Sequence, residues 1–506
     1  MRPVHKAALA AAALLATLCV PVAQGALTAA ASDRPSVLAR YYDQHPAWHR
    51  CGSPDRYPAA YQCATVTVPL DYAHPDGRTL TLKVSRLRTS VPGKRHGVLL
   101  SNPGGPGDLA LDDPITMKDA LAKSVRDRYD LVGFDPRGLG ASSPLQCGLT
   151  QDEASPALRP YRPATFAKDT IRARDTAARC VARERARLPY ITTRNTARDM
   201  DVIRGVLGEK KISYLGWSYG TYLGAVYTQL FPHRSDRMVL DSAVDPNRFG
   251  RHTNQAMASG AESAFRNWSR LVARRNGIYH LGDTSAKVRA VFWRQVARAE
   301  RTPIRYRGSD ETHQGSVVTG DGIRDWLRAD FSNAPYQAAR ELADLRNSPT
   351  THAVSATSGG KADPADDNAI ALNLAVMCGD NSVSWPRDPA RYRQDARRAK
   401  ARHPLYGDFT ANITPCAFWP KGSEPVTRVD NRVGALVVQN QWDSQTPLSE
   451  GLAMHHALHG SRLVSIRDGR GHVVYGMPDA PLCVTRTVNS YLITGRLPVR
   501  DVTCRS

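Results

Sequence analysis

Short apolar runs alternate with longer amphipathic stretches in the first half of the chain. The runs at residues 97–101, 129–134 and 237–241 are each followed by a polar or glycine-rich loop, which is typical of buried parallel strands. Stretches with helical periodicity stand between them, at 165–188 and 196–207. This alternation predicts an α/β fold, in which helices cover both faces of a mostly parallel sheet.

The pattern changes between residues 249 and 426. Amphipathic helical runs dominate there, and loops rich in Gly, Ser and Asp separate them. Strand patterns return at 435–439 and 462–466. We therefore expect a core built from residues 32–248 and 427–506, with a mostly helical cap (249–426) inserted between its two parts.

The first residues predict an export signal. Arg2, His5 and Lys6 precede an apolar run at 7–20, and small residues suited to cleavage follow. The apolar run is too short for a comfortable membrane span, and no later segment resembles a membrane helix. We expect residues 1–31 to be removed and the mature protein to be secreted, without membrane insertion.

The cysteines agree with export. Once Cys19 has left with the signal, eight remain, an even number that suits an oxidising compartment. Many pairings are open to eight cysteines, and we favour bonds between neighbours along the chain: Cys51–Cys63, Cys147–Cys180, Cys378–Cys416 and Cys483–Cys504.

No metal site or cofactor is expected. The chain has no Cys-x-x-Cys spacing. His455 and His459 have the spacing of a metal-binding helix, but His456 stands where a zinc peptidase would carry its glutamate. Surface positions are the better interpretation of these histidines.

The formal net charge of +21 comes mainly from arginines scattered through the helical runs, with acids interleaved. No basic stripe studded with aromatic residues appears, so we expect no nucleic-acid partner. A solvated basic surface that favours anionic cell-envelope polymers fits the pattern better.

The sequence Gly216-Trp217-Ser218-Tyr219-Gly220 joins a strand-like run to a helix-like run. This is the pattern of a nucleophile elbow, a sharp turn that lifts a serine hydroxyl clear of a sheet. The two glycines are needed because side chains there would collide with the strand or the helix. Chance can also produce this string in a glycine-containing chain, so the rest of a catalytic triad has to be found.

A serine hydroxyl attacks efficiently only when an oriented base removes its proton. Asp443 and His472 each follow one of the two C-terminal strand patterns, and the order Ser, acid, His is that of elbow-type hydrolases. We predict the triad Ser218, Asp443 and His472. Asp468 is a rival acid, but it lies too close in sequence to His472 to come from the preceding strand.

The oxyanion of the reaction needs two N–H donors. The backbone N–H of Tyr219, directly after the serine, is the first candidate. The second should come from the loop Asn102-Pro103-Gly104-Gly105-Pro106-Gly107, where glycines let the backbone approach a substrate closely, and we choose Gly105.

Several motifs carry a family resemblance: Val68-Pro69-Leu70-Asp71-Tyr72, the Asn102–Gly107 loop, Gly133-Phe134-Asp135-Pro136-Arg137-Gly138, Ser218-Tyr219-Gly220-Thr221, Asp443-Ser444-Gln445-Thr446-Pro447 and Gly471-His472. With these motifs the chain resembles the secreted tripeptidyl aminopeptidases, in the proline iminopeptidase branch of the α/β-hydrolase serine peptidases. The resemblance implies the α/β-hydrolase fold, the same triad, and release of short peptides from free N-termini. Proline iminopeptidases carry a His-Gly-Gly-Pro loop, whereas Asn102-Pro103 precedes Gly104 here, which favours the tripeptidyl branch.

Acids in the cap could bind the substrate ammonium, and Asp380 is our candidate, against a role in the cap fold or at a helix end.

The expected function is a serine exopeptidase for peptides with free N-termini. An ester hydrolase on the same triad, and an inactive envelope-binding protein with a hydrolase fold, stay open as alternatives.

Overall fold

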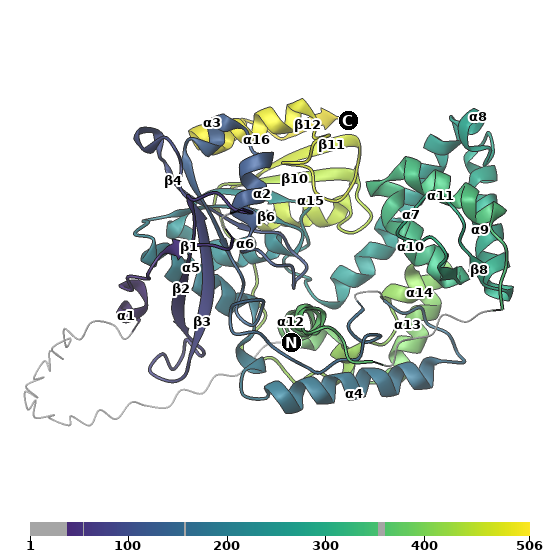
Figure 1. The fold of residues 1–506 in the computed structure, drawn as a ribbon, viewed down its shortest axis with the longest axis horizontal. Helices are drawn as coiled ribbons and strands as arrows, with labels where there is room; N and C mark the ends of the chain where they lie inside the picture. Colours follow the sequence, from purple (N-terminus) through teal and green to yellow (C-terminus); the bar gives the residue numbers. More distant parts are fainter. Residues whose placement is uncertain (1–37, 54, 156–157, 353–359) are drawn as a thin grey trace, which may run out of the picture.

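A computed structural model describes residues 38–53, 55–155, 158–352 and 360–506, so the predicted signal lies outside the described residues. A mixed sheet organises the described chain (Figure 1). Its first strands, through β3, are antiparallel, and the strands from β5 onward run parallel to one another. In spatial order the strands are β1 (His49–Arg50), β2 (Tyr61–Pro69), β3 (Thr79–Leu87), β5 (Tyr129–Phe134), β4 (Gly97–Asn102), β6 (Ile212–Trp217), β7 (Ser235–Asp241), β10 (Ala435–Trp442), β11 (Arg462–Arg470) and β12 (Val502–Arg505).

The central strands are rich in apolar residues at successive positions because both faces of the sheet are covered. On β6, Tyr214 packs into one apolar cluster and the next residue, Leu215, into another, as alternating strand residues must. One face carries α5 (Thr193–Val206), α6 (Tyr219–Leu230) and α15 (Leu448–Ala457), and the other carries α2 (Asp113–Ala120), α3 (Lys123–Arg126) and α16 (Leu482–Thr494). The α/β fold expected from the sequence is confirmed.

A separate helical body, on the right in Figure 1, packs around its own apolar cluster, which includes Trp268, Phe292 and Phe331. We call this body the cap. Its elements are α7 (Arg251–Ala273), α8 (Asn276–Tyr279), α9 (Ser285–Arg301), β8 (Ile304–Arg305), β9 (Val317–Val318), α10 (Gly320–Asn333), α11 (Pro335–Asn347), α13 (Pro389–Arg402) and α14 (Gly407–Thr410).

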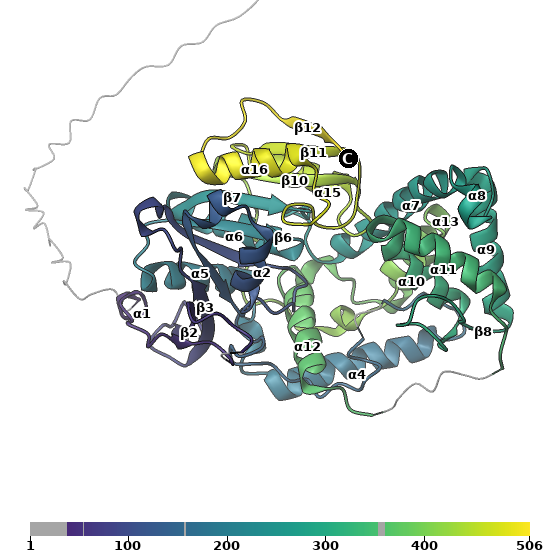
Figure 2. The same cartoon turned by 45° about the horizontal axis from the view of Figure 1, so that its top comes forward.

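Two helices differ from the expected division of the chain. Helix α12 (Pro364–Gly379) falls within the predicted cap range, yet Ala371 and Ala375 pack into the apolar cluster of the core. Helix α4 (Phe166–Glu184) precedes the elbow in sequence, yet it runs below α12 toward the cap in both views (Figures 1 and 2). Its amphipathic pattern predicts a helix but does not say which body the helix joins.

Four disulfide bonds join Cys51 to Cys63, Cys147 to Cys180, Cys378 to Cys416 and Cys483 to Cys504. The pairing of neighbours predicted from the sequence is therefore confirmed. Such bonds form and persist in an oxidising environment. Among the described helices, none combines the length and apolar character needed to cross a bilayer.

Candidate active site

Ser218 lies in the turn between β6 and α6 with φ 53° and ψ −123°, a conformation that an L-residue rarely adopts. The neighbouring glycines make the turn possible. A Cβ on Gly216 would lie 2.5 Å from the carbonyl oxygen of Gly220, and a Cβ on Gly220 would lie 2.3 Å from that of Asn102. The backbone N–H of Ser218 donates to the carbonyl of Asp241 on β7 (3.1 Å) and ties the turn to the sheet.

Asp443 and His472 form a hydrogen-bonded pair in loops that follow β10 and β11. The Nδ1 atom of His472 lies 2.9 Å from Oδ2 of Asp443, and Asp443 is 1% exposed. The other carboxylate oxygen accepts backbone N–H groups from Gln445 (2.8 Å) and Thr446 (3.0 Å), and the Thr446 hydroxyl donates to Oδ2 (2.9 Å). These bonds fix the carboxylate in one orientation toward the ring.

The pKa of His472 follows from this environment. Burial of the ring lowers the pKa, and the Asp443 carboxylate raises it by more, so the pKa lies above the ordinary value of a histidine. With Nδ1 facing the carboxylate, the neutral ring presents its other nitrogen as the acceptor for a proton.

The segment that carries His472 is held at four consecutive backbone N–H groups. The N–H of His472 donates to Oδ1 of Asn333 (2.9 Å), and that of Val473 to the Ser242 hydroxyl (2.8 Å). The N–H groups of Val474 and Tyr475 both donate to Oδ2 of Asp241 (3.0 and 2.6 Å). We call residues 472–475 the histidine loop. Asp241 is fully buried, and burial raises its pKa to about 6.

The cap contacts the loops of both predicted triad partners. Asn333, at the end of α10, holds the histidine loop, and the preceding Ser332 donates to the hydroxyl of Ser444, next to Asp443 (2.8 Å). On α7, a Cβ at Gly260 would lie 3.0 Å from the carbonyl oxygen of Asp443, so the helix can approach only because no side chain is there.

The loop after β4 lies against the elbow. A Cβ on Gly104 would lie 2.9 Å from Cβ of Ser218 and 3.4 Å from the backbone nitrogen of Tyr219. Gly104 has φ 120°, which favours glycine for a second reason. The two predicted oxyanion residues, Gly105 and Tyr219, line one cavity together with Ser218.

This cavity has a volume of about 660 Å³, within the range of small-molecule and peptide pockets. Its walls come from the loop after β4, the elbow, the Asp443 loop, and helices α4, α7, α10 and α12. Thr446 lies in the wall, and its hydroxyl contacts both Oδ2 of Asp443 (2.9 Å) and Nδ1 of His472 (3.3 Å), so the Asp443–His472 pair lies directly behind this part of the wall.

Asp380 lies elsewhere. Its carboxylate accepts the backbone N–H of Thr193 at the start of α5 (3.0 Å), and it lines a small separate pocket beside Glu424. Burial raises the pKa of Asp380 to about 7. This position fits the alternative, helix-end role better than a contact with the substrate ammonium. The rival acid Asp468 is exposed on β11.

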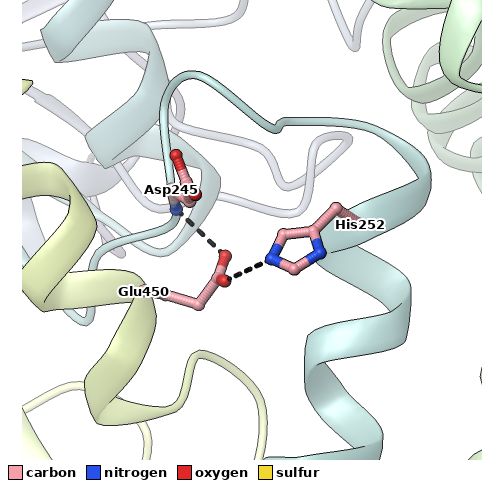
Figure 3. A group of neighbouring side chains, drawn as sticks. All are labelled: Asp245, His252 and Glu450. Carbon is pink, nitrogen blue, oxygen red and sulfur yellow. Dashed lines mark hydrogen bonds and ion pairs between the residues drawn. The ribbon is translucent and has the colours of Figure 1, made fainter.

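The histidines considered as metal ligands have local partners instead: His455 bonds to Ser461 (2.7 Å) and His459 to Asp430 (2.7 Å). Another group of potential ligands joins cap and core, namely Asp245, His252 and Glu450, whose ligand atoms lie within 4.8 Å of one another (Figure 3). Glu450 accepts the backbone N–H of Asp245 (3.0 Å) and faces the ring of His252 (3.1 Å). Both oxygens of Glu450 are thus used by protein groups, as in an internal ion pair between α7 and α15.

Sequence reasoning missed Asp241, Asn333 and Thr446. Asp241 ends a strand at the carboxyl edge, which is a usable signal because ligands and catalytic groups gather there. Thr446 stands within a motif already noted. Asn333 is a polar residue at the end of a cap helix, and nothing in the chain's pattern marks it.

A serine in a strained elbow, a buried Asp–His pair and a mixed sheet of this strand order define a serine hydrolase of the α/β-hydrolase fold. A family model described as "alpha/beta hydrolase fold" matches residues 97–310, and one described as "TAP-like protein" matches residues 403–504.

The chain is 36% identical over 477 residues to a tripeptidyl aminopeptidase of Streptomyces lividans, which covers 90% of this chain and 86% of that protein. It is 31% identical over 521 residues to the serine protease Hip1 of Mycobacterium tuberculosis, covering 98% and 96%. Carboxylesterase B of Mycobacterium tuberculosis is 30% identical over 461 residues, covering 88% and 86%. The chain belongs to the tripeptidyl aminopeptidase family of α/β-hydrolases.

Proposed function

We propose that this protein is a secreted serine exopeptidase that removes short peptides from free N-termini. The observation that carries the proposal is a strained serine elbow in the wall of a cavity bordered by helices, with a buried Asp–His pair connected to the same wall through Thr446. The aminopeptidase and protease relatives support peptide substrates.

In this proposal His472 removes the proton of Ser218 as the hydroxyl attacks the scissile carbonyl. The backbone N–H groups of Gly105 and Tyr219 stabilise the oxyanion of the tetrahedral intermediate. The protonated ring then gives its proton to the leaving amine, which leaves an acyl-enzyme on Ser218 that water hydrolyses. Asp443 keeps the ring oriented and stabilises its charged form.

Selection of a chain end would come from the walls of the cavity. Helices α4, α7, α10 and α12 surround the space in front of Ser218, which limits how much chain can extend beyond it. Five carboxylates line this space and could pair with a substrate ammonium in place of Asp380: Asp108, Glu153, Asp169, Asp325 and Asp366.

Secretion is part of the same proposal. Residues 1–31 have the sequence pattern of an export signal, and the four disulfides suit an oxidising compartment. Loss of residues 1–31 would remove Arg2 and Lys6 and no acid, so the formal net charge would fall only from +21 to +19, and the secreted protein would favour contact with anionic envelope polymers.

A comparison of matched substrates tests the activity. We expect kcat/KM for an unblocked peptide to exceed that of its N-acetylated twin by on the order of 100-fold, since acetylation removes the ammonium charge and adds bulk at the closed end. Equal rates for both would remove the exopeptidase claim.

The carboxylesterase relative favours one second candidate, an ester hydrolase on the same triad. Acyl esters without an amino group distinguish the two functions. If esters are hydrolysed well while unblocked peptides are left intact, the esterase is the correct assignment. Ser218→Ala should abolish whichever activity is present.

A further inference from the structure

Arginine side chains line the cavity in front of Ser218 at Arg159, Arg172 and Arg328. The first two form ion pairs with one shared carboxylate, that of Asp152. Arg328 differs. Within the described residues no carboxylate forms an ion pair with it, and its Nε and Nη1 atoms are buried without a hydrogen-bond partner.

The guanidinium of Arg328 lies over an aromatic ring. Its Cζ atom lies 4.4 Å from the centroid of Tyr406, and Tyr406 is 2% exposed. The Tyr406 hydroxyl donates to Asp325 (2.8 Å), the acid that lies about one turn before Arg328 on α10. Asp330 lies two residues after Arg328 and its pKa is influenced by the charge of Arg328, but the two form no ion pair in the described chain. Stacking leaves the nitrogen edge of a guanidinium available for in-plane hydrogen bonds.

Arg328 stands close to the predicted catalytic base. It lies on α10, whose last residue, Asn333, accepts the N–H of His472. Burial and the Asp443 carboxylate have the largest effects on the pKa of His472. The positive charge of Arg328 has a smaller effect and lowers this pKa. Arg328 therefore lines the same cavity as Ser218 and is close enough to His472 to act on its pKa.

A buried charge normally has a partner, because removing it from water costs free energy that only pairing offsets. A guanidinium presents parallel N–H donors that match the two oxygens of a carboxylate. We propose that Arg328 binds a carboxylate of the peptide substrate, so that peptides with such a group near the scissile bond are preferred. This inference rests on the proposed peptidase function.

The carboxylate could come from two parts of a peptide. One source is the C-terminus of a short substrate, which lies near the scissile bond when few residues follow it. The other is an Asp or Glu side chain beside that bond. Short unblocked peptides with a C-terminal carboxylate or amide test the first source, and amidated peptides with Glu or Gln beside the bond test the second.

In at least one of these two substrate pairs, the wild-type protein should cleave the peptide with the carboxylate with a kcat/KM higher than that of its neutral twin, on the order of 10-fold or more. This is the size expected for a charged hydrogen bond. Raising the salt concentration should reduce the ratio. In Arg328→Gln the ratio should fall to about one, and Arg328→Lys should retain part of it because the charge stays and the fork is lost.

Arg159→Gln is the matched control, because it removes a paired arginine from the same cavity and should keep the wild-type ratio. Ratios near one for both pairs in the wild-type protein overturn the inference, even if the Arg328 variants do not fold. An unchanged ratio in a folded Arg328→Gln overturns it as well. If no unblocked peptide is cleaved at all, the proposed function fails first, so the two failures can be told apart.

Discussion

Single residues in this site are held by hydrogen bonds that the chemistry needs. Ser218 keeps a rare backbone conformation because its N–H is bound to β7 and the glycines on either side leave room. Asp443 accepts three hydrogen bonds from the segment that follows it, in addition to its bond with His472. A carboxylate so fixed can orient the ring without reorganising during the reaction.

The raised pKa of His472 gives a prediction for pH dependence. A base must be neutral to accept the serine proton, so kcat/KM should rise with pH through the pKa of His472 and level off above it. Because that pKa is raised, the midpoint should lie above the usual histidine value of about 6.5. A midpoint below this value in the wild-type profile would contradict the geometry.

Asp443→Asn should lower kcat by roughly 10⁴-fold, because the amide no longer favours the required tautomer or the charged ring. Loss of the carboxylate should also shift the midpoint of the residual activity to lower pH, since that carboxylate is the main group raising the pKa of His472. Asp468→Asn serves as the control, and a comparable loss in that variant would reassign the acid.

Between elements, the active site depends on contacts across the sheet edge and across the cap. The histidine loop is bound by the last residue of β7, by Ser242 directly after it and by the end of α10, and the Asp443 loop packs against α7 and α10. The cap is therefore in contact with the loops of acid and base as well as with the cavity.

Asp241→Ala should destabilise the protein by about 2–4 kcal/mol, because two buried N–H groups of the histidine loop lose their acceptor. It should also lower kcat more than it raises KM, since the loop positions the base. Asp241→Asn retains one oxygen and should recover much of both. Wild-type kcat in a folded Asp241→Ala, checked by thermal melting and steady-state kinetics, would show that the loop needs no such anchor.

Asn333→Ala removes the cap contact to His472, an exposed hydrogen bond worth about 1 kcal/mol. We expect kcat to fall about 3- to 10-fold with little change in KM, and Asn333→Asp, which keeps the accepting oxygen, to lose less. A change confined to KM would mean that Asn333 serves substrate binding and not the base.

At the scale of the whole molecule, the sequence predicted what strong local signals encode. Periodicity predicted the sheet and most cap helices. The turn at Ser218 and the two loops that hold Asp443 and His472 were predicted from their places after strands, and their catalytic roles stay a prediction. The neighbouring cysteines led to the observed disulfides. The assignment of α4 and α12 could not be predicted, because an amphipathic pattern shows that one face is buried but not against which partner. The sequence does not show that Arg328 lines the cavity of Ser218 and that Asp380 lies in a separate pocket, because these cavities are assembled from distant segments.

The disulfides offer a test of how the cap region is stabilised. Cys378–Cys416 closes 38 residues and joins the end of α12 to the cavity wall, whereas Cys51–Cys63 closes 12 residues near the first strands. A disulfide that closes a longer loop restricts the unfolded chain more. Replacing Cys378 and Cys416 by alanine should therefore lower Tm more than replacing Cys51 and Cys63 by alanine. The loss expected for each bond is about 2–4 kcal/mol. The reverse order in thermal melts would contradict this argument.

The central claim is that Ser218 serves a peptidase restricted to free chain ends. The most direct measurement is a mass-spectrometric time course on one unblocked peptide of about ten residues, beside its acetylated twin. The account predicts that short fragments of constant length leave in sequence from the N-terminus, that the acetylated peptide stays intact, and that Ser218→Ala cleaves neither. Internal fragments, or equal cleavage of both peptides by the wild-type protein, would contradict it.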